Sequence, residues 1–157
     1  MTLPYTIRTV EPEDLAGVSA CLAAAFEPYR ARYTDGAYDD TVPALNELGR
    51  RAENLRIFVA VDRRGRIVAT VGAGRTGSEG HLRGMAVLPE CQGEGLGDRM
   101  LVTAESELKS AGCTRVTLDT TAPLARAIRF YQRNGYRPTG VVSDFFGMPL
   151  YEYEKTL

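Results

Sequence analysis

The feature that most restricts the fold is a glycine-rich segment, QGEGLG, at residues 92–97. Glycines alternate there at Gly93, Gly95 and Gly97, between an apolar stretch, MAVLP, and an amphipathic one, DRMLVTAESELK. Glycine weakens both helices and strands, so three of them between two regular elements need a physical reason. Either the chain turns tightly at this point, or its backbone closely approaches a ligand.

Size and composition are those of an ordinary globular chain. The 157 residues suit a single domain, 1–157, and hydrophobic and charged residues make up 44% and 25%. The net charge of −1 provides no basic field, so we expect no nucleic-acid partner. We also expect no membrane partner and no secretory signal, because no apolar run reaches the length of a membrane span or follows a basic N-terminus.

The three cysteines, Cys21, Cys91 and Cys113, are odd in number and far apart in the sequence. This spacing argues against a disulfide framework or a zinc site, and it favours a reduced, cytoplasmic protein. Cys91 lies next to the glycine segment, but no motif places a histidine or asparagine partner for it. It is therefore interpreted as a bystander rather than a nucleophile.

Hydrophobic periodicity predicts the order β-α-α-β-β-β-α-β-α-β-β, and hence one mixed α/β sheet with helices on both faces. The helix after the glycine segment has an apolar stripe that should face the core, formed by Leu96, Met100, Leu101, Ala104 and Leu108. Residues 74–80 are expected to form a loop. A last helix is expected at residues 121–134, with Thr121 as its N-terminal cap.

A strand, a glycine segment and a helix in succession can form an anion site. Free N–H groups converge at the helix N-terminus, where the helix dipole adds roughly half a positive charge. A Walker loop is excluded because the segment continues as Gly97-Asp98-Arg99 and not as Gly-Lys-Ser/Thr. A dinucleotide fingerprint is excluded because the spacing is G-x-G-x-G. A tight turn without a ligand remains the alternative.

Two longer stretches resemble the GNAT acyltransferases. LRGMAVLPECQGEGLGDRMLVTAESELKSAG is similar to motif A of that family, with Gln92, Gly95 and Gly97 on its Gln/Arg-x-x-Gly-x-Gly/Ala pattern. ARAIRFYQRNGYRPTG is similar to motif B, and the resemblance covers about residues 57–142. It implies a GNAT-like fold, which is a mixed, mostly antiparallel sheet flanked by helices in a single domain.

The resemblance implies acetyl-CoA as the cofactor. Backbone N–H groups of the glycine segment would hold its pyrophosphate, which assigns cofactor binding to Gln92, Gly93, Glu94, Gly95, Leu96, Gly97 and Asp98. The main chain of the preceding strand, at Met85, Ala86 and Val87, would bond the pantetheine arm like an added strand. The chain departs from motif B at Leu124, where the family often has an asparagine. Thr120, Thr121 or Arg126 would then replace that contact.

Acyl transfer to an amine needs an acid and a base, and the resemblance suggests both. Tyr131 matches the tyrosine that the family commonly supplies as general acid on the last long helix. A phenol suits this role because its pKa of ~10 keeps the proton at neutral pH. The alternative role of Tyr131 is that of a core aromatic. His81 stands where many members have a glutamate base, and an imidazole can do the same work. Glu79 lies two residues earlier on the same strand face. Water, without any dedicated base, is the third possibility.

The acceptor site would be formed by the first helices and the late hairpin. Tyr29, Tyr33 and Phe145 are the candidate contacts for a small-molecule or peptide amine. Tyr29, Tyr33 and Tyr38, with Arg30 and Arg32, could line a pocket for an aromatic or anionic acceptor, whereas Asp35, Asp39 and Asp40 could instead attract an amine. A solvated loop is the alternative for the tyrosines, and Phe145 and Phe146 could instead form the surface of a homodimer.

Two functions follow from the sequence. The first is an acetyl-CoA-dependent N-acetyltransferase. The second is a non-catalytic GNAT-like module that senses CoA or a metabolite.

Overall fold

The structure is a computed structural model that describes residues 4–157, so the first three residues of the expected domain 1–157 lie outside it. Among the described residues, the strands are β1 (Tyr5–Thr9), β2 (Arg56–Asp62), β3 (Ile67–Thr76), β4 (Glu79–Val87), β5 (Arg115–Thr120), β6 (Arg137–Phe145) and β7 (Met148–Thr156). The α-helices are α1 (Leu15–Phe26), α2 (Asp35–Thr41), α3 (Leu45–Asn54), α4 (Leu96–Ser110) and α5 (Ala125–Arg133). Short 3₁₀ turns occupy Pro12–Asp14, Glu27–Arg32 and Pro89–Cys91.

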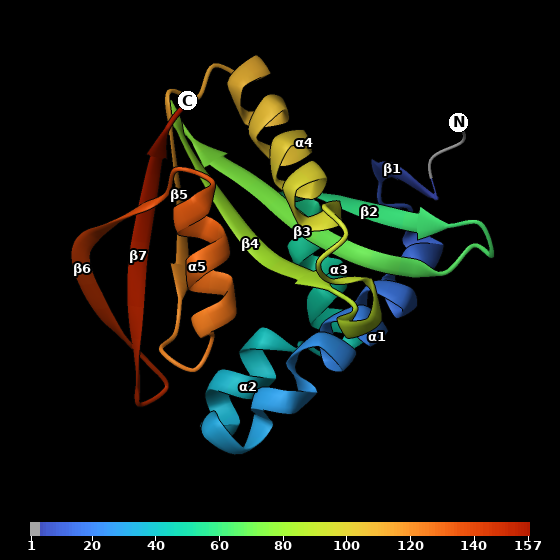
Figure 1. Cartoon of the computed structure of the whole chain (residues 1–157), viewed down its shortest axis with the longest axis horizontal. Helices are drawn as coiled ribbons and strands as arrows, with labels where there is room; N and C mark the ends of the chain where they lie inside the picture. Colours follow the sequence, from blue (N-terminus) through green and yellow to red (C-terminus); the bar gives the residue numbers. More distant parts are fainter. Residues whose placement is uncertain (1–3) are drawn as a thin grey trace.

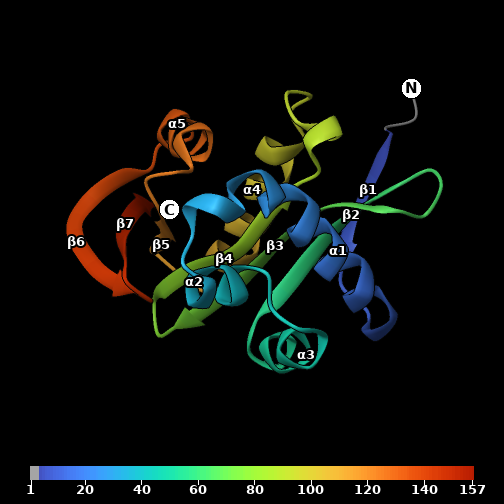
Figure 2. The same ribbon diagram turned by 90° about the horizontal axis from the view of Figure 1, so that it is seen from below.

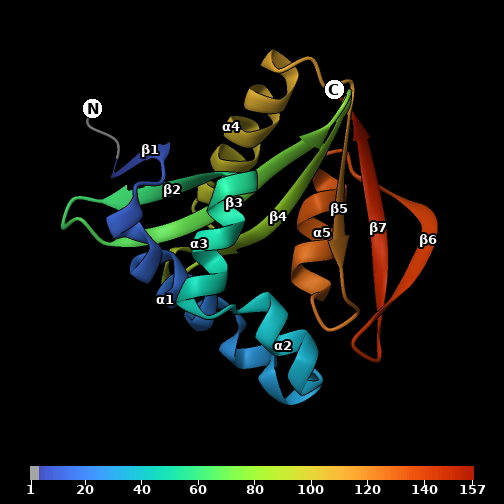
Figure 3. The same ribbon diagram turned by 180° about the vertical axis from the view of Figure 1, so that it is seen from behind.

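All seven strands join one sheet in the order β1-β2-β3-β4-β5-β7-β6. Neighbouring strands are antiparallel except for β4 and β5, which run parallel. Helices α4 and α5 lie in front of the sheet in Figure 1, whereas α1 and α3 lie on the face seen in Figure 3. Figure 2 shows α5 and α3 on opposite sides of the strands. The expected fold class is therefore confirmed.

The parallel pair β4 and β5 separates partway along its length. The two strands are in register from Glu79 with Arg115 to Leu82 with Leu118, and no further. Strand β4 continues to Val87 along β3, while β5 continues along β7, and Figure 1 shows the two strands diverging. The second half of β4 is therefore left without a strand partner on its β5 side.

Helix α4 fixes this sheet from one face. All five residues of its predicted apolar stripe are buried, as expected from their spacing. The helix packs on β2, β3 and β4, and a Cβ atom added to Gly80 of β4 would lie only 2.7 Å from Leu108. Within residues 4–157, none of the helices is long and apolar enough to cross a membrane.

Two local predictions are wrong, and one helix was not predicted. Residues 74–80 form a hairpin and not a loop, because β3 runs to Thr76 and the chain reverses through Gly77 at φ +60. Residues 35–41 form an unpredicted helix, α2, whose cap Thr34 accepts a bond of 3.3 Å from the Ala37 N–H. Helix α5 begins at Ala125, so Thr121 does not cap it.

Core packing along α4 generates a first prediction. Leu101 is 1% exposed, whereas the next residue, Val102, is 58% exposed. We expect Leu101→Ala to lower the free energy of unfolding by about 2–5 kcal/mol, because it leaves a cavity. The matched change Val102→Ala should alter it by less than about 0.5 kcal/mol in urea unfolding. Equal losses from the two variants would contradict this assignment of the core.

Candidate active site

A cavity of about 700 Å³ occupies the gap between β4 and β5. Side chains from both faces of the sheet reach it, from α2 and α3 on one side and from the glycine segment and α5 on the other. It brings together most of the residues predicted from the sequence, namely Tyr29, Tyr33, His81, Met85, Ala86, Val87, Gln92, Gly93, Gly95, Gly97, Asp98, Thr121, Arg126, Tyr131 and Phe145.

Three predicted residues do not line the cavity. Glu79 lies at the paired end of β4, where its carboxylate is 2.8 Å from Arg115. Glu94 accepts a hydrogen bond of 2.5 Å from the Tyr5 hydroxyl, and the side chain of Leu96 is buried in the core. The structure therefore does not bring the Glu79 carboxylate to the cavity, and residues 94 and 96 can reach a ligand there only through their backbone.

The glycine segment has the backbone geometry of an anion site. Gly93 and Gly95 both have φ of +81°, which side chains rarely adopt, and Gly95 is the N-cap of α4. Among residues 4–157, the backbone N–H groups of residues 93–98 donate to no other backbone group. A row of free donors at the N-terminus of a 15-residue helix favours a negatively charged ligand.

Two other residues of the segment have structural roles. The Gln92 side-chain amide donates a hydrogen bond of 3.0 Å to the Val87 carbonyl, so it fastens the segment to the end of β4. A Cβ atom on Gly97 would lie 3.3 Å from the Phe130 ring, so this glycine allows α4 and α5 to approach closely. Of the three alternating glycines, Gly93 and Gly95 shape the loop and Gly97 serves packing.

Arg126 adds positive charge to this end of the cavity. One of its guanidinium nitrogens lies 3.9 Å from the position that a Cβ atom of Gly93 would occupy. Arg126 is in the first turn of α5, one residue after the helix begins. The loop amides and this side chain therefore face the same space from two different helices.

His81 of β4 lines the cavity from the part of the strand that is still paired with β5. Its Nδ1 atom is 2.8 Å from the Thr117 hydroxyl on β5, and its Nε2 atom is 3.5 Å from an Asp119 carboxylate oxygen. Burial raises the pKa of the Asp119 carboxyl, while the nearby imidazole acts to lower it. Two side chains of β5 therefore contact both ring nitrogens, so the imidazole is fixed in orientation and has an acid beside it.

Tyr131 projects from α5 toward the same cavity. Its half-buried ring lies between Phe130 and Tyr136, with centroids 5.4 Å and 5.9 Å away. Burial raises the pKa of the Tyr131 phenol to about 12, so the group keeps its proton at neutral pH. Within the described part of the chain, the hydroxyl has no hydrogen-bond partner, which leaves it available to a ligand.

The tyrosines after α1 are not a solvated loop. The Tyr33 hydroxyl lies 2.7 Å from the Thr121 hydroxyl, which ties this segment to the end of β5. The Thr34 hydroxyl donates a bond of 2.8 Å to the Phe146 carbonyl in the β6–β7 turn. Tyr33 and Thr121 both line the cavity, so these contacts join the segment after α1 to the end of β5 and to the β6–β7 turn.

Three polar residues of the cavity were not predicted from the sequence, namely Arg51, Arg83 and Asp119. Asp119 could have been predicted, because it is the one acid in the strand sequence RVTLDT and lies near the end of that strand. The two arginines could not, because α3 and β4 meet only in the folded chain. Among residues 4–157, no group of His, Cys, Asp and Glu side chains is placed to hold a metal ion.

The loop with its unpaired amides leads into a cavity through the sheet, and His81, Asp119 and Tyr131 line the same cavity. A model of the acetyltransferase (GNAT) family matches residues 19–136, and the chain belongs to this family. The expected class of acyltransferase enzymes is thereby confirmed, with acetyl-CoA as the cofactor of the family.

Individual relatives agree with this family. An uncharacterized N-acetyltransferase of Methanocaldococcus jannaschii is 30% identical over 90 residues, which are 57% of this chain and 58% of that protein. The aminoalkylphosphonate N-acetyltransferase of Salmonella typhimurium is 36% identical over 58 residues, or 37% and 38% of the two chains. The chain thus matches less than two thirds of the length of either curated relative.

The fold also resembles solved structures along its whole length. The paiA N-acetyltransferase of Thermoplasma acidophilum, solved in complex with coenzyme A, superposes with a TM-score of 0.79. The superposition covers 99% of this chain and 100% of that chain, at 19% identity. Because the two sequences are only 19% identical, this similarity shows a shared fold alone.

Asp119 generates a prediction about pH. Because burial raises its pKa in the folded state, the folded chain binds the proton more tightly than the unfolded chain. Its contribution to stability is therefore complete below the ordinary carboxyl value of ~4 and is lost as pH rises through the folded value. Chemical denaturation from about pH 3.5 to 7 should show this loss in the wild type relative to Asp119→Asn.

The exposed acid Asp39 on α2 provides the control, since Asp39→Asn removes the same charge outside the cavity. Its stability should follow that of the wild type across the pH range. A wild-type stability that rises with pH relative to Asp119→Asn would contradict the assigned environment of this carboxyl.

Proposed function

We propose that the chain transfers an acetyl group from acetyl-CoA to a primary amine of a small molecule or peptide, by direct attack of the amine. The observation that carries the proposal is the cavity between β4 and β5, because it joins the amide-lined loop to His81 and Tyr131. The Salmonella typhimurium relative is an aminoalkylphosphonate N-acetyltransferase, which supports a small molecule as the acceptor. Three free, buried cysteines support a reduced, cytoplasmic setting.

The residues at the loop fit the cofactor. Free N–H groups of residues 93–98 and the Arg126 guanidinium would bind the phosphates. The unpaired backbone edge of β4, at Met85–Val87, would bond the pantetheine amides as an added strand would. When bound in this way, acetyl-CoA supplies the acetyl group as a thioester. The Val87 carbonyl already accepts a hydrogen bond from Gln92, so the other backbone groups of this edge would bond the pantetheine amides.

His81, or a water molecule beside it, would act as the base. An alkylammonium group, with a pKa of ~10.4, must lose a proton before its nitrogen can attack. Thr117 fixes the Nδ1 side of the imidazole, which directs Nε2 toward Asp119. The Asp119 carboxylate, 3.5 Å from Nε2, would keep a proton on that nitrogen, so Nδ1 would accept a proton from the Thr117 hydroxyl while that hydroxyl takes one from the amine. The same carboxylate would stabilise the imidazolium that forms.

Tyr131 would act as the acid. The phenol keeps its proton at neutral pH because burial raises its pKa to about 12. It can therefore donate that proton to the sulfur that leaves the acetyl group, which would otherwise depart as an unprotonated thiolate. Tyr29, Tyr33 and Phe145 would form the acceptor end of the cavity.

Release of the CoA thiol from acetyl-CoA, measured against a panel of amines, tests the proposal. Turnover with at least one amine, together with formation of the N-acetylated product, is the expected result. Tight binding of CoA without turnover of any amine would contradict it and favour a sensor of CoA or of another metabolite.

The loop provides the sharpest test of cofactor binding. Gly95→Asp places a negative charge at the helix N-terminus, so we expect CoA affinity to fall by at least about tenfold in calorimetry. Gly65→Asp is a matched control, because Gly65 has φ of +80° and open space like Gly95 but lies in the β2–β3 turn. Both variants should lose similar stability, about 1–2 kcal/mol. Unchanged CoA affinity in Gly95→Asp would contradict the phosphate site.

The acid role of Tyr131 has its own test. Tyr131→Phe should lower kcat by about 10²-fold while leaving the affinity for CoA within about twofold, because the ring remains and only the proton donor is lost. Tyr136→Phe is the control: its ring is adjacent, but its hydroxyl donates to Glu105 outside the cavity. A loss of CoA affinity without a loss of kcat would make Tyr131 a packing residue.

A further inference from the structure

Two arginines share one carboxylate at the acceptor end of the cavity. Arg51 of α3 bonds the Asp40 side chain at 3.1 Å and the Asp40 carbonyl at 3.0 Å. Arg83 of β4 contacts both carboxylate oxygens of Asp40 at 3.2 Å, through a single nitrogen. All three residues line the cavity that holds His81 and Tyr131. Asp40 is therefore already bound by two cations and is not free to attract an amine.

This arrangement leaves donors unsatisfied. A guanidinium carries five N–H donors, and Arg83 uses only one of its three nitrogens within the part of the chain that the structure describes. The buried Nε of Arg51 makes no hydrogen bond there, although a Glu47 carboxylate oxygen lies 3.5 Å away. A buried donor without an acceptor costs free energy, and the unused nitrogens of Arg83 are donors that a ligand with several oxygen acceptors could bond.

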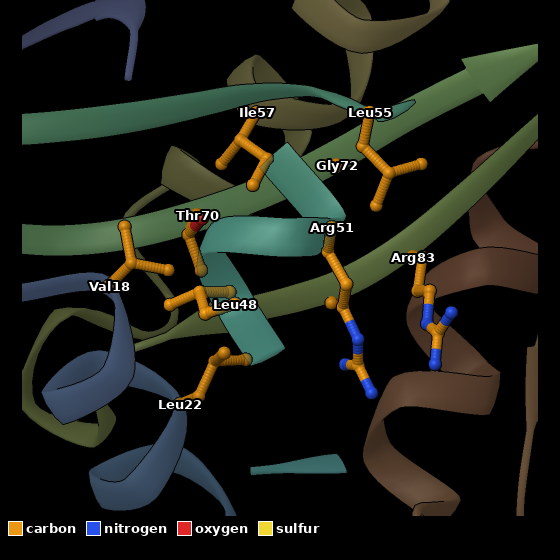
Figure 4. Close-up of a pocket in the computed structure, with 10 residues that line it drawn as sticks. Val18, Leu22, Leu48, Arg51, Leu55, Ile57, Thr70, Gly72 and Arg83 are labelled. Carbon is orange, nitrogen blue, oxygen red and sulfur yellow. The ribbon is translucent and has the colours of Figure 1, made fainter. Parts of the chain in front are cut away.

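The two arginines are also held in place. The Arg51 side chain is only 12% exposed, and Figure 4 shows it beside Leu48 with its guanidinium pointing the same way as that of Arg83. A smaller cavity of about 20 Å³, lined by apolar side chains, is bordered by both arginine stems. Desolvation and the neighbouring Arg83 charge lower the pKa of Arg51, whereas the Asp40 and Glu47 carboxylates act to raise it.

The position of Arg83 sets the distance to the reacting centre. His81 and Arg83 are two residues apart on β4, so their side chains leave the same face of the strand roughly 6–7 Å from each other. An acceptor with its amine at His81 could reach Arg83 with a group a few bonds away. Both ends of such a molecule would then lie in the same cavity.

We propose that Arg51 and Arg83 bind an anionic group of the acceptor, so that the substrate is a small amine carrying a carboxylate, phosphonate or phosphate. The inference rests on the proposed N-acetyltransferase function and specifies its substrate class. The two guanidiniums offer fork-shaped donors that match the oxygens of these groups. The Asp40 carboxylate bonds both arginines, and the acceptor's anionic group would bind to the donors that Asp40 leaves unused.

Acceptors of equal length and different charge test the inference. We expect kcat/KM for β-alanine and for 2-aminoethylphosphonate to exceed that for β-alanine amide by at least about tenfold, equal to about 1.4 kcal/mol. The ratio between the first two acceptors separates a carboxylate site from a phosphonate site. Equal rates with the amide, or a preference for 1,3-diaminopropane, would overturn the inference.

A pair of variants locates the preference. Arg83→Gln should reduce kcat/KM for the anionic acceptors by about 10–100-fold and leave the amide within about twofold. Arg75→Gln, at the end of β3, removes the same charge from an exposed residue outside the cavity, whose guanidinium bonds the Gly77 carbonyl, and should change neither. Arg83 is 43% exposed, so the variant should keep its melting temperature, which is measured alongside. Equal losses for the anionic and neutral acceptors would also overturn the inference.

Binding separates this inference from the proposed function. If no amine is acetylated, the N-acetyltransferase proposal fails, and the anion site is then judged by calorimetry of 2-aminoethylphosphonate with the CoA-bound protein. Wild type should bind it at least about tenfold more tightly than Arg83→Gln does, whether or not acetyl transfer occurs. Equal affinities would reject the anion site in that case as well.

Discussion

The separation of β4 from β5 after Leu82 is the constraint on which the rest of the structure depends. Backbone N–H and C=O groups need partners, and a sheet that opens in its middle leaves a row of them unpaired. The Gln92 amide bonds one carbonyl of this edge, at Val87, and leaves the others facing the cavity. The same opening connects the two faces of the sheet, so a ligand held on one face can meet a second ligand from the other.

Positive charge reaches this opening from two groups of residues. The amides of residues 93–98 and Arg126 belong to the side of the cavity formed by the glycine segment and α5, whereas Arg51 comes from α3 and Arg83 from β4. His81, Asp119 and Tyr131 also line the cavity, and the proposed function assigns them the proton transfers. The two positive groups would hold two negatively charged molecules in one cavity with these side chains, where burial alters the pKa values of the acid groups.

Much of the donor side could be predicted from the sequence, because its signals are local. A 3.6-residue stripe identified the buried face of α4, and two motifs placed the loop and Tyr131 on the correct elements. The acceptor side could not be predicted in the same way. Asp40, Arg51 and Arg83 come from three elements, and Thr121 bonds Tyr33 at a separation of 88 residues instead of capping α5. Only tertiary packing determines such contacts. For the same reason the sequence placed Glu79 beside His81 as a candidate base, whereas in the fold its carboxylate contacts Arg115 outside the cavity.

The backbone amides of the glycine segment provide the most direct measurement of the central claim. Titration of the ¹⁵N-labelled chain with CoA should shift the amide resonances of Gly93, Gly95 and Gly97, because these N–H groups gain phosphate acceptors. The amide of Gly65, which already donates to the Asp62 carbonyl at 3.0 Å, should remain unchanged. Saturation with CoA without a change at residues 93–98 would contradict the account, since the cofactor would then be held elsewhere.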